Sequence, residues 1–511
     1  MPGVSRRTVA KAAGIVTGAV VLPAAALSGW IWVTADKTNV GRVTFDQALH
    51  IPELLAPPID ADGVRGFEVS LQEGTAEFLP GNPANTWGIN GPYLGPTLRL
   101  ARGDAVHIDV TNSLPEATTI HWHGMELPAR MDGGPHQVID PGDTWSPAWH
   151  VDQLPATLWY HPHPHGETQR HVYQGLAGLI IIEDDDPSLP VEYGVDDIPL
   201  ILQDKEFGDH GQLTLDTSND WFGTELIGFL GSDILVNGTW GPFLEVDRAM
   251  IRFRVLNAAN ARIFDVAFDD GRQFMVVAND VGHLPAPVPV DHFMLSPGER
   301  VEFLCAFEPG ERCRMVSRPP DLDANFIVDR LAGGGDGFEL LEIRAAQTLD
   351  DDYTMPERLP APPPVDDVNV ATTRKFVLGD FNTINGVAMD MSRIDFVVSL
   401  GGDEVWEIEN GSLNPHNFHV HNAAFTILDI GGQPPPEAMS GRKDTVYVSP
   451  GSTVRVAIMF GQYADPRMPY MLHCHLLVHE DAGMMQQFVL VEPGTEGDVV
   501  TTIDPYSHDG H

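Results

Sequence analysis

The chain has 511 residues, and its 30 Lys and Arg stand against 72 Asp and Glu, which gives a formal net charge of −42. A length of this kind predicts about three domains. The negative charge argues against a nucleic-acid partner and raises the local concentration of cations. A surface adapted to solubility or high salt explains the same acidity without any partner.

The N-terminus carries a twin arginine, Arg6-Arg7, in front of an uncharged segment from Ala12 to Val33. A twin arginine before an apolar segment is an export address that a receptor reads. The segment has 22 residues, so it is also long enough to span a bilayer as an uncleaved anchor. We therefore predict that residues 1–40 are a twin-arginine signal or anchor. The twin-arginine machinery would export the folded protein to the periplasm, the cell surface or the medium.

Beyond this segment, short alternating or apolar runs are separated by Gly, Pro, Asn and Asp. With 50 Gly, 42 Pro and little helical periodicity, the pattern predicts an all-β chain built of β-sandwiches. The clearest predicted strands are Thr97 to Leu100, Ala105 to Val110, Leu179 to Ile182, Ile251 to Val255, Val301 to Phe307 and Val454 to Phe460.

Two breaks in composition divide the chain into three units. The acidic turn Glu183 to Pro187 closes the first unit, and the Pro-rich run Pro356 to Pro364 separates the second from the third. A weak turn-to-strand repeat supports three related units, at Leu98–Asp104, Leu295–Val301 and Val448–Val454. The predicted units are 41–186, 187–350 and 371–511, with a linker at 351–370.

Histidine is frequent, with 21 in the chain, and it is clustered. Two imidazoles in a His-x-His pair share one face of an extended chain, with Cα atoms roughly 6 to 7 Å apart, and can bind neighbouring metal ions. A polar strand face or an adventitious zinc site explains one such pair equally well, but not four. The four pairs are His121/His123, His161/His163, His419/His421 and His473/His475.

The run from His473 to Met485 contains three imidazoles, a thiol and two thioethers. Its apolar flanks, Pro469 to Leu472 and Gln486 to Val491, predict that it begins at the end of one strand and loops into the next. Because side chains alternate on a strand, Cys474 points away from its two histidine neighbours. One tripeptide can therefore serve two metal sites.

The count of donors indicates copper. His416 and His479 lie outside the four pairs, and with Cys474 and a weak Met484 they complete the donor set of a blue-copper centre. The eight paired imidazoles suffice for a cluster of three copper ions. A zinc site typically takes four ligands and would leave the rest without a role.

In order and spacing, these motifs resemble the signature of the multicopper oxidases, the family of laccases, bilirubin oxidases and cuprous oxidases, from about residue 45 to 495. The resemblance implies three cupredoxin-like Greek-key domains and four copper ions, one of type 1, one of type 2 and two of type 3. Every ligand position has a matching residue. The implied ligands are His416, Cys474, His479 and Met484 for type 1, His121 and His419 for type 2, His123, His161 and His475 for one type 3 ion, and His163, His421 and His473 for the other.

The same resemblance implies an oxidase that takes electrons one at a time from a small reductant, passes them through Cys474, and reduces O2 to water. Two carboxylates beside the ligands, Asp132 and Glu480, match acidic positions that relay protons in the family. Each is also explained as a group that orients a ligand histidine. The middle unit has no His-x-His pair, as the family's structural second domain would predict. Four further histidines near the motifs are interpreted as supporting or surface groups, His136, His150, His165 and His171.

The substrate is less well defined. Similar cuprous oxidases have a methionine-rich insertion, and an acidic residue and a Met before the first type 1 histidine, whereas here that stretch reads Gly411 to Pro415. Met389 and Met391 are more typical of core fillers than of a copper site. This favours a phenol or an aromatic amine that approaches near His416. The alternatives are cuprous oxidation in copper tolerance, a nitrite-reducing or electron-transfer cupredoxin, copper storage, and a copper-free structural protein of the cell envelope.

Two further cysteines, Cys305 and Cys313, flank a turn signal, Glu308 to Glu311, between two β-like runs. An exported chain tolerates a disulfide. The sequence is equally compatible with a disulfide across a hairpin and with two buried thiols.

Overall fold

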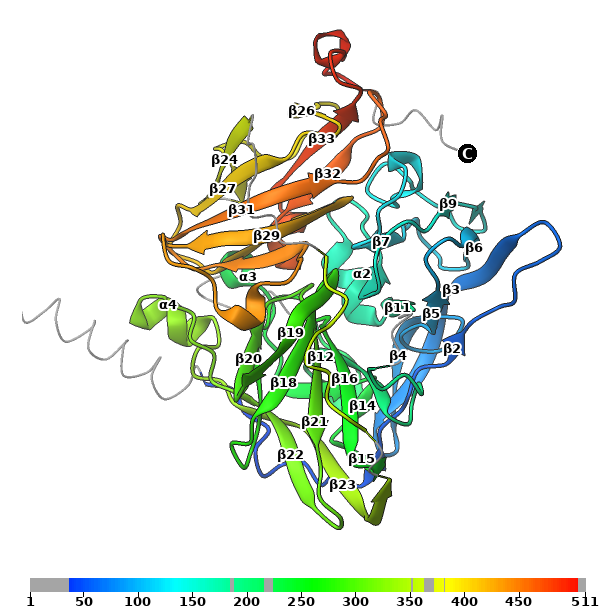
Figure 1. Cartoon of the computed structure of the whole chain (residues 1–511), viewed down its shortest axis with the longest axis vertical. Coiled ribbons are helices and arrows are strands. Elements are labelled where there is room, and N and C mark those ends of the chain that lie inside the picture. Colours follow the sequence, from blue (N-terminus) through cyan, green and yellow to red (C-terminus); the bar gives the residue numbers. More distant parts are fainter. Residues whose placement is uncertain are drawn as a thin grey trace, which may run out of the picture.

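The structure of the protein is a computed structural model that describes residues 36–183, 188–215, 224–350, 353–362, 372–380 and 382–503. Six β-sheets form three pairs that follow one another along the chain, from blue to red in Figure 1. The predicted all-β fold class is confirmed, and each of the six predicted runs overlaps a strand. The twin arginine and the apolar segment after it lie outside the described residues.

The first pair of sheets precedes residue 184. Strand β6 (Ala105–Asn112) alternates buried and half-buried residues, so one of its faces packs on a core that includes Phe67, Ile108 and Trp122. Strand β11 (Gly178–Ile182) is buried on both faces. One sheet has the order β2 (Leu54–Leu55), β5 (Thr97–Leu100), β11 (Gly178–Ile182), β10 (Ala156–His161) and β7 (His121–His123). The other has β4 (Asn82–Ile89), β3 (Val64–Leu79), β6 (Ala105–Asn112) and β8 (Thr144–Trp145), and β9 (Ala148–His150) also pairs with β6.

The middle pair encloses the phenylalanine-rich core around Phe253, Phe303 and Phe338. Its larger sheet has the order β14 (Thr239–Trp240), β13 (Asp233–Val236), β12 (Asp197–Lys205), β16 (Met250–Asn257), β21 (Arg300–Ala306), β18 (Phe274–Asn279) and β19 (Gly282–Val290). The other has β1 (Gln47–Ala48), β15 (Pro242–Arg248), β23 (Phe338–Asp350), β22 (Arg312–Arg318), β17 (Phe264–Phe268) and β20 (His292–Leu295).

The third pair encloses a core around Phe376, Trp406 and Phe418. One sheet has the order β25 (Thr383–Ile384), β24 (Thr372–Gly379), β27 (Glu404–Asn410), β31 (Thr453–Phe460) and β29 (Ala423–Ile430). The other has β26 (Phe396–Ser399), β33 (Met485–Val491), β32 (Tyr470–His473), β28 (His416–Val420) and β30 (Thr445–Val448).

Helices are short and lie in the connections. They are α2 (Thr168–Gln174), α3 (Thr224–Ile227), α4 (Phe326–Leu331) and α5 (Leu477–Asp481), with 3-10 turns η1 (Ala129–Met131), η2 (Asp209–Gly211), η3 (Glu437–Met439) and η4 (Glu496–Asp498). Within the described ranges, none of them has the length and apolar character needed to cross a membrane.

The start of the described chain differs from the predicted units. Strand β1 lies in the range predicted for the first unit, but it pairs in parallel with β15 of the middle pair. Asn39 exchanges two hydrogen bonds with the backbone of Glu339, at 2.8 and 2.7 Å. The described part of the chain therefore first joins the middle pair of sheets and then builds the first pair. Of the two predicted seams, residues 184–187 and 363–371 lie outside the described residues.

Cys305 and Cys313 are both buried and free, so of the two alternatives that the sequence leaves open the structure has the two buried thiols and not the hairpin disulfide. Cys305 lies on β21 and Cys313 on β22, and these strands belong to the two different sheets of the middle pair. The turn between them crosses from one sheet to the other. Each thiol packs into the shared core instead of facing its partner across a ladder.

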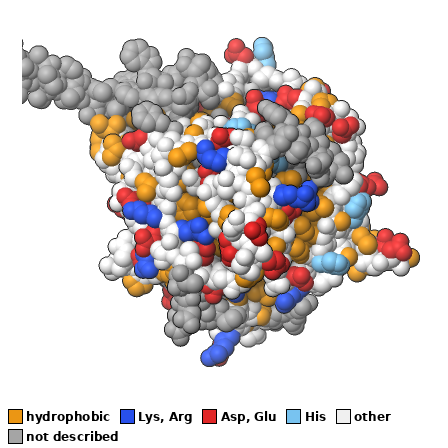
Figure 2. All heavy atoms as spheres, turned by 90° about the horizontal axis from the view of Figure 1, so that it is seen from above, with side chains coloured by type: hydrophobic (Ala, Val, Ile, Leu, Met, Phe, Trp, Pro, Cys, Tyr) orange, Lys and Arg blue, Asp and Glu red, His pale blue; other side chains and the backbone are white. Residues whose placement is uncertain are grey.

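The acidic excess does not form one continuous patch on the face seen in Figure 2, where acidic side chains are interspersed with basic and hydrophobic ones. This mixture agrees with the interpretation of the net charge as a general solubility property.

We predict that all three cysteines are thiols in the metal-free protein. Titration with a thiol reagent in denaturant, without reductant, should give three reactive groups per chain, because Cys305, Cys313 and Cys474 are free. A count of one would contradict this and restore the disulfide.

Candidate metal centre

Cys474 and two histidines form a compact donor triad in the third unit. The Cys474 Sγ lies 3.5 Å from the Nδ1 of His416 and 3.5 Å from the Nδ1 of His479, and these two nitrogens are 3.1 Å apart. His416 begins β28, Cys474 follows the end of β32, and His479 lies on α5, a helix that the sequence did not predict. All three are fully or almost fully buried.

Burial raises the pKa of the Cys474 thiol to about 12. A thiolate at this position therefore requires a nearby cation, and a metal ion deprotonates a coordinating thiol outright. The Nε2 of His416 lies 3.0 Å from the Ser412 hydroxyl, and the Nε2 of His479 donates to the Leu226 carbonyl at 3.1 Å. Both rings thus present Nδ1 to the triad, and the donor set fits a soft metal ion.

The predicted fourth donor, Met484, is fully buried beside the triad. Its backbone N–H donates to the His479 carbonyl at 2.8 Å, and its carbonyl accepts from the Cys474 N–H at 3.1 Å. The chain therefore returns at Met484 to the two residues that supply the sulfur and one of the nitrogens.

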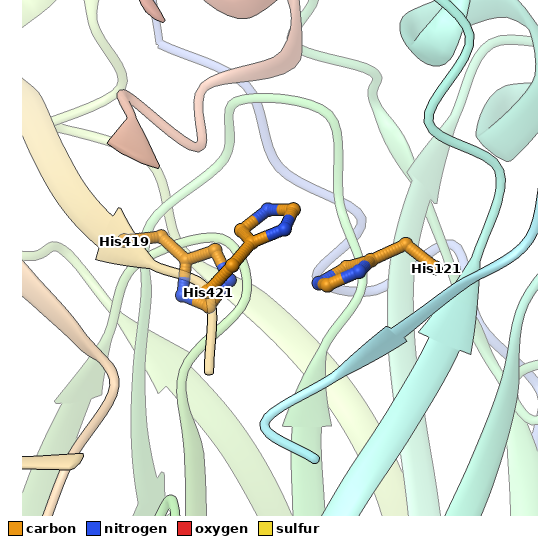
Figure 3. A group of neighbouring side chains, drawn as sticks. All are labelled: His121, His419 and His421. Atoms are coloured by element: carbon orange, nitrogen blue, oxygen red, sulfur yellow. The ribbon is translucent and has the colours of Figure 1, made fainter. Parts of the chain in front are cut away.

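The eight paired histidines converge between the first and third units. Strand pairing aligns His121 with His161 in the first unit and His419 with His473 in the third. Figure 3 shows His121 pointing toward His419 and His421 from the opposite side. These histidines form three groups, and within each group the ligand atoms lie within 4.8 Å of one another. Two groups coincide with the predicted type 3 sets, His123, His161 and His475 and then His163, His421 and His473. The third group is His121, His419 and His421.

The two units are joined by stacked imidazoles. The ring of His121 stacks on His421 at a centroid distance of 3.8 Å, and the ring of His123 stacks on His419 at 3.7 Å. Each stack takes one ring from each unit. The cluster is therefore also the contact between the two units.

Backbone carbonyls fix the direction of several rings. The Nδ1 of His121 donates to Asp132 O at 2.9 Å, that of His161 to Pro162 O at 2.8 Å, and that of His419 to Asp444 O at 2.9 Å. The Nε2 atoms of these three rings are buried and have no hydrogen-bond partner among the described residues. These hydrogen bonds from Nδ1 to a carbonyl select the tautomer in which Nε2 is free to bind a metal ion. The cluster thus fits metal binding on its own chemistry.

The cluster histidines are in the form that binds metals. Burial, followed by repulsion from neighbouring imidazoles, lowers the pKa of His121 to about 3 and that of His163 well below its usual value. Neutral imidazole is the metal ligand. The protein therefore presents lone pairs, and no cationic rings, to an incoming ion.

The two predicted carboxylates lie against this cluster. The Asp132 carboxylate accepts from His421 Nδ1 at 2.7 Å, and burial raises its pKa to about 6. Glu480 lies 3.3 Å from His163 Nδ1 and 3.2 Å from His473 Nδ1, and burial raises its pKa well above the usual value. Both positions can hold a proton next to the ligands.

A third carboxylate, Asp444, was missed by the sequence reasoning. It accepts from His123 Nε2 at 3.1 Å, and it is fully buried. Its backbone carbonyl accepts from His419, while the carbonyl of Asp132 accepts from His121. Each aspartate therefore holds a histidine of its own unit by its carbonyl and one of the other unit by its carboxylate. No motif marks Asp444 in the sequence.

The four further histidines that the sequence singled out lie outside these groups. His171 is buried between the Thr118 hydroxyl and the Glu116 carboxylate, at 2.9 and 2.8 Å, and His136 contacts Gln487 at 2.8 Å. His150 and His165 are exposed.

Comparison with known proteins gives a consistent result. Family models described as multicopper oxidase match residues 70–187 and 358–494. The chain is 36% identical over 447 residues to the multicopper oxidase mco of Staphylococcus aureus, across 86% of this chain and 91% of the relative. It is 37% identical over 463 residues to the cell division protein FtsP of Sodalis glossinidius, across 88% and 95%. A solved laccase-like multicopper oxidase, CueO from Ochrobactrum sp., superposes with a TM-score of 0.78 at 36% identity, across 87% of this chain and 100% of that one.

We predict that copper stabilises the native chain, because buried imidazole nitrogens gain a partner. At free copper of 100 times the dissociation constant, the gain is about 2.7 kcal/mol per site. Calorimetry of apoprotein and anaerobically loaded protein should show a higher melting temperature on loading. His161→Ala should reduce the shift, whereas His150→Ala, which removes an exposed histidine, should leave it unchanged. An equal melting temperature with and without copper would contradict the prediction.

Proposed function

The chain belongs to the multicopper oxidase family, and from that premise we propose that it is a laccase-like oxidase. It couples the one-electron oxidation of phenols or aromatic amines to the four-electron reduction of O2 to water. The observation that carries the proposal is that eleven of the twelve predicted donors are buried in groups whose ligand atoms lie within 4.8 Å of one another, and that the twelfth, Met484, is also buried. Four bound copper ions would supply the storage of single electrons and the binding of O2.

Each ligand has one proposed place. The type 1 ion is held by His416, Cys474, His479 and the weak Met484. The remaining ligands divide among three ions, with His121 and His419 for type 2, His123, His161 and His475 for one type 3 ion, and His163, His421 and His473 for the other. The grouping of the donor atoms supports this division.

Cys474 links the two parts of the site. Its sulfur lies in the triad, while its covalent neighbours His473 and His475 lie in the histidine cluster, so electrons travel through bonds alone. The Asn417 side chain holds this junction, because its oxygen accepts from the His475 N–H at 2.6 Å and lies 3.6 Å from the Cys474 sulfur.

The reductant binds where apolar side chains reach the surface beside the triad. Leu413 is 69% exposed and follows Ser412, which contacts His416. Leu226 is 49% exposed, and its carbonyl accepts from His479. Neither histidine is itself open to solvent. A flat aromatic ring fits such exposed leucines, since the Leu226 backbone is hydrogen-bonded to one ligand of the type 1 ion and Leu413 is the covalent neighbour of a residue that contacts another.

Asp132 and Glu480 deliver the protons that O2 reduction consumes. Burial raises the pKa of Asp132 to about 6 and that of Glu480 well above its usual value, which favours the protonated form of both, and each lies against ligand histidines of the cluster. The general acid role requires such a match between the pKa and the working pH.

Two alternatives have support of their own. Met389 contacts the residue before Met484, since its N–H donates to the Gly483 carbonyl at 2.9 Å, and a thioether near this segment suits cuprous ions as an alternative reductant. The relatives named cell division protein FtsP support a role in cell division as the second alternative, in place of the structural cell-envelope role considered from the sequence. The complete ligand set favours the enzyme over the second alternative.

We also propose that the chain is exported by the twin-arginine route and works outside the cytoplasm. The support is the Arg6-Arg7 pair and the apolar segment after it. Its other partners would be O2 and the small reductant.

The deciding experiment is to purify the protein with copper, measure copper per chain and the visible spectrum, and follow oxygen uptake with a phenol and with cuprous ions. We expect about four copper ions, an intense blue band, and uptake that is faster with the phenol. Copper well below four per chain and no blue band would refute the enzyme. Faster uptake with cuprous ions would favour the first alternative.

Cys474→Ser should abolish the blue band and reduce oxygen uptake to background, because the sulfur is both the chromophore and the electron path. The control is Cys305→Ser, which removes a buried thiol of the middle unit and should retain both signals. A blue band that survives in Cys474→Ser would contradict the ligand assignment.

Glu480→Gln should lower kcat by about 10²- to 10⁴-fold, the usual contribution of a positioned proton donor, with the blue band unchanged. Asp481→Asn is the matched control, since this neighbouring carboxylate accepts from the backbone N–H groups of Thr168 and Gln169 instead of facing a ligand. It should alter stability more than turnover. Stopped-flow measurement of oxygen uptake distinguishes the two, and equal turnover losses would refute the relay.

A further inference from the structure

A loop of the middle unit reaches the histidine cluster. Gly298 has a φ of +85°, and a Cβ on it would come within 3.1 Å of the His475 ring and 3.3 Å of the His123 ring. Residues with a Cβ rarely adopt this backbone conformation. The loop therefore needs glycine at this position both for its turn and for its close approach to the two rings. The middle unit, which supplies no ligand, thus touches two of them.

Arg300, two residues later, uses all of its donors at this contact. It donates to both oxygens of Asp444 at 2.8 and 2.7 Å. Its other three bonds go to backbone carbonyls of Thr157, Gly298 and Asp280, at 3.0, 2.9 and 2.9 Å. A guanidinium has five N–H donors, so this fully buried side chain is held in a single orientation.

Asp444, held by Arg300, in turn contacts two histidine rings of the cluster. Its carboxylate accepts from His123 of the first unit at 3.1 Å, and its carbonyl accepts from His419 of the third unit at 2.9 Å. These are the two rings that stack at 3.7 Å. Three units therefore meet at one carboxylate.

The Arg300–Asp444 ion pair is not explained by a gain in stability. A buried ion pair gives little net stability compared with well-packed apolar residues. The ion pair has a geometric explanation instead. A carboxylate fixed by Arg300 can accept from His123, and this hydrogen bond sets which nitrogen of the His123 ring faces the cluster. Lys443 extends the network, with contacts to Asp280 at 3.0 Å and Glu299 at 3.1 Å.

We propose that Asp444 and Arg300 are positioning residues of the metal centre. Arg300 of the middle unit holds the Asp444 carboxylate, and Asp444 holds His123 and His419 at the geometry that the type 2 ion and one type 3 ion require. This inference rests on the proposed function and assigns to the middle unit a direct part in assembling the site.

The test compares Arg300→Lys and Asp444→Asn with Arg262→Lys. Arg262 is a second buried arginine of the middle unit, and it binds Asp204 at 3.0 Å and Asp336 at 2.6 Å without contact to a cluster histidine. All variants and the wild type are loaded with copper, and type 2 copper is measured by electron paramagnetic resonance. The blue band of the type 1 ion, whose ligands do not contact Asp444, serves as an internal standard.

We expect Arg300→Lys and Asp444→Asn to weaken copper binding at the cluster by about 10- to 100-fold and to change the type 2 hyperfine splitting, with the blue band retained. Arg262→Lys should lower the melting temperature and leave the type 2 spectrum as in the wild type. If Arg300→Lys does not fold, the isosteric Asp444→Asn decides alone.

Two results would overturn the inference. One is a type 2 spectrum and copper affinity unchanged in Asp444→Asn. The other is a parallel loss of blue band and type 2 signal that follows the melting temperature equally in all three variants. A wild type without any type 2 signal would instead overturn the proposed function, and the inference would fall with it.

Discussion

The structure depends on one constraint: eight neutral imidazoles are buried against one another between two β-sandwich units. A buried polar nitrogen without a partner costs about 1 to 3 kcal/mol, and several of these nitrogens have no partner within the described chain. Bound metal ions remove that cost. Because the same rings form the stacks between the first and third units, metal ions bound by these rings would also hold the two units together.

The segment His473 to His475 of the third unit must supply donors to two different groups. Cys474 needs a cation, because burial raises its pKa to about 12, and its neighbours must face the other way. β32 ends at His473, and just beyond the strand the backbone places Cys474 in the triad and His475 in the histidine cluster. The middle unit then holds the junction from outside. Asn417 donates to Ser296 and Pro297 of that unit, at 3.0 and 2.7 Å, and Leu226 accepts from His479.

The sequence predicts the parts of the site that repeat at fixed local spacing. His-x-His pairs, and the Cys474 segment between two apolar runs, are local patterns that single out the candidate donors, whereas the division of these donors among the ions is implied by the resemblance to the multicopper oxidases. Asp444 and Arg300 were missed because their role exists only in three dimensions, 144 residues apart along the chain. The same holds for Leu226, which contacts His479 through its carbonyl and so leaves no trace in the residue type.

The fold shows the same division between local and distant information. Alternation and apolar runs located the strands, but not which sheet each strand joins. Glu308 to Glu311 has the composition of a hairpin turn, yet it connects β21 and β22 of two different sheets. Strand β1 likewise pairs with β15, which follows it by almost two hundred residues. Pairing partners depend on how whole units pack, and a turn signal says only that the chain reverses.

Asp132 and Asp444 make the same kinds of contact to the cluster histidines but have different proposed roles. Asp132 and Asp444 each bind one histidine by a carbonyl and another by a carboxylate. Burial raises the pKa of Asp132 to about 6, so it can exchange a proton near neutral pH, whereas Asp444 is clamped by the two N–H groups of Arg300. In the proposed oxidase, one carboxylate can then move protons while the other keeps the rings in place. The asymmetry comes from the middle unit, because Arg300 reaches only one of the two positions.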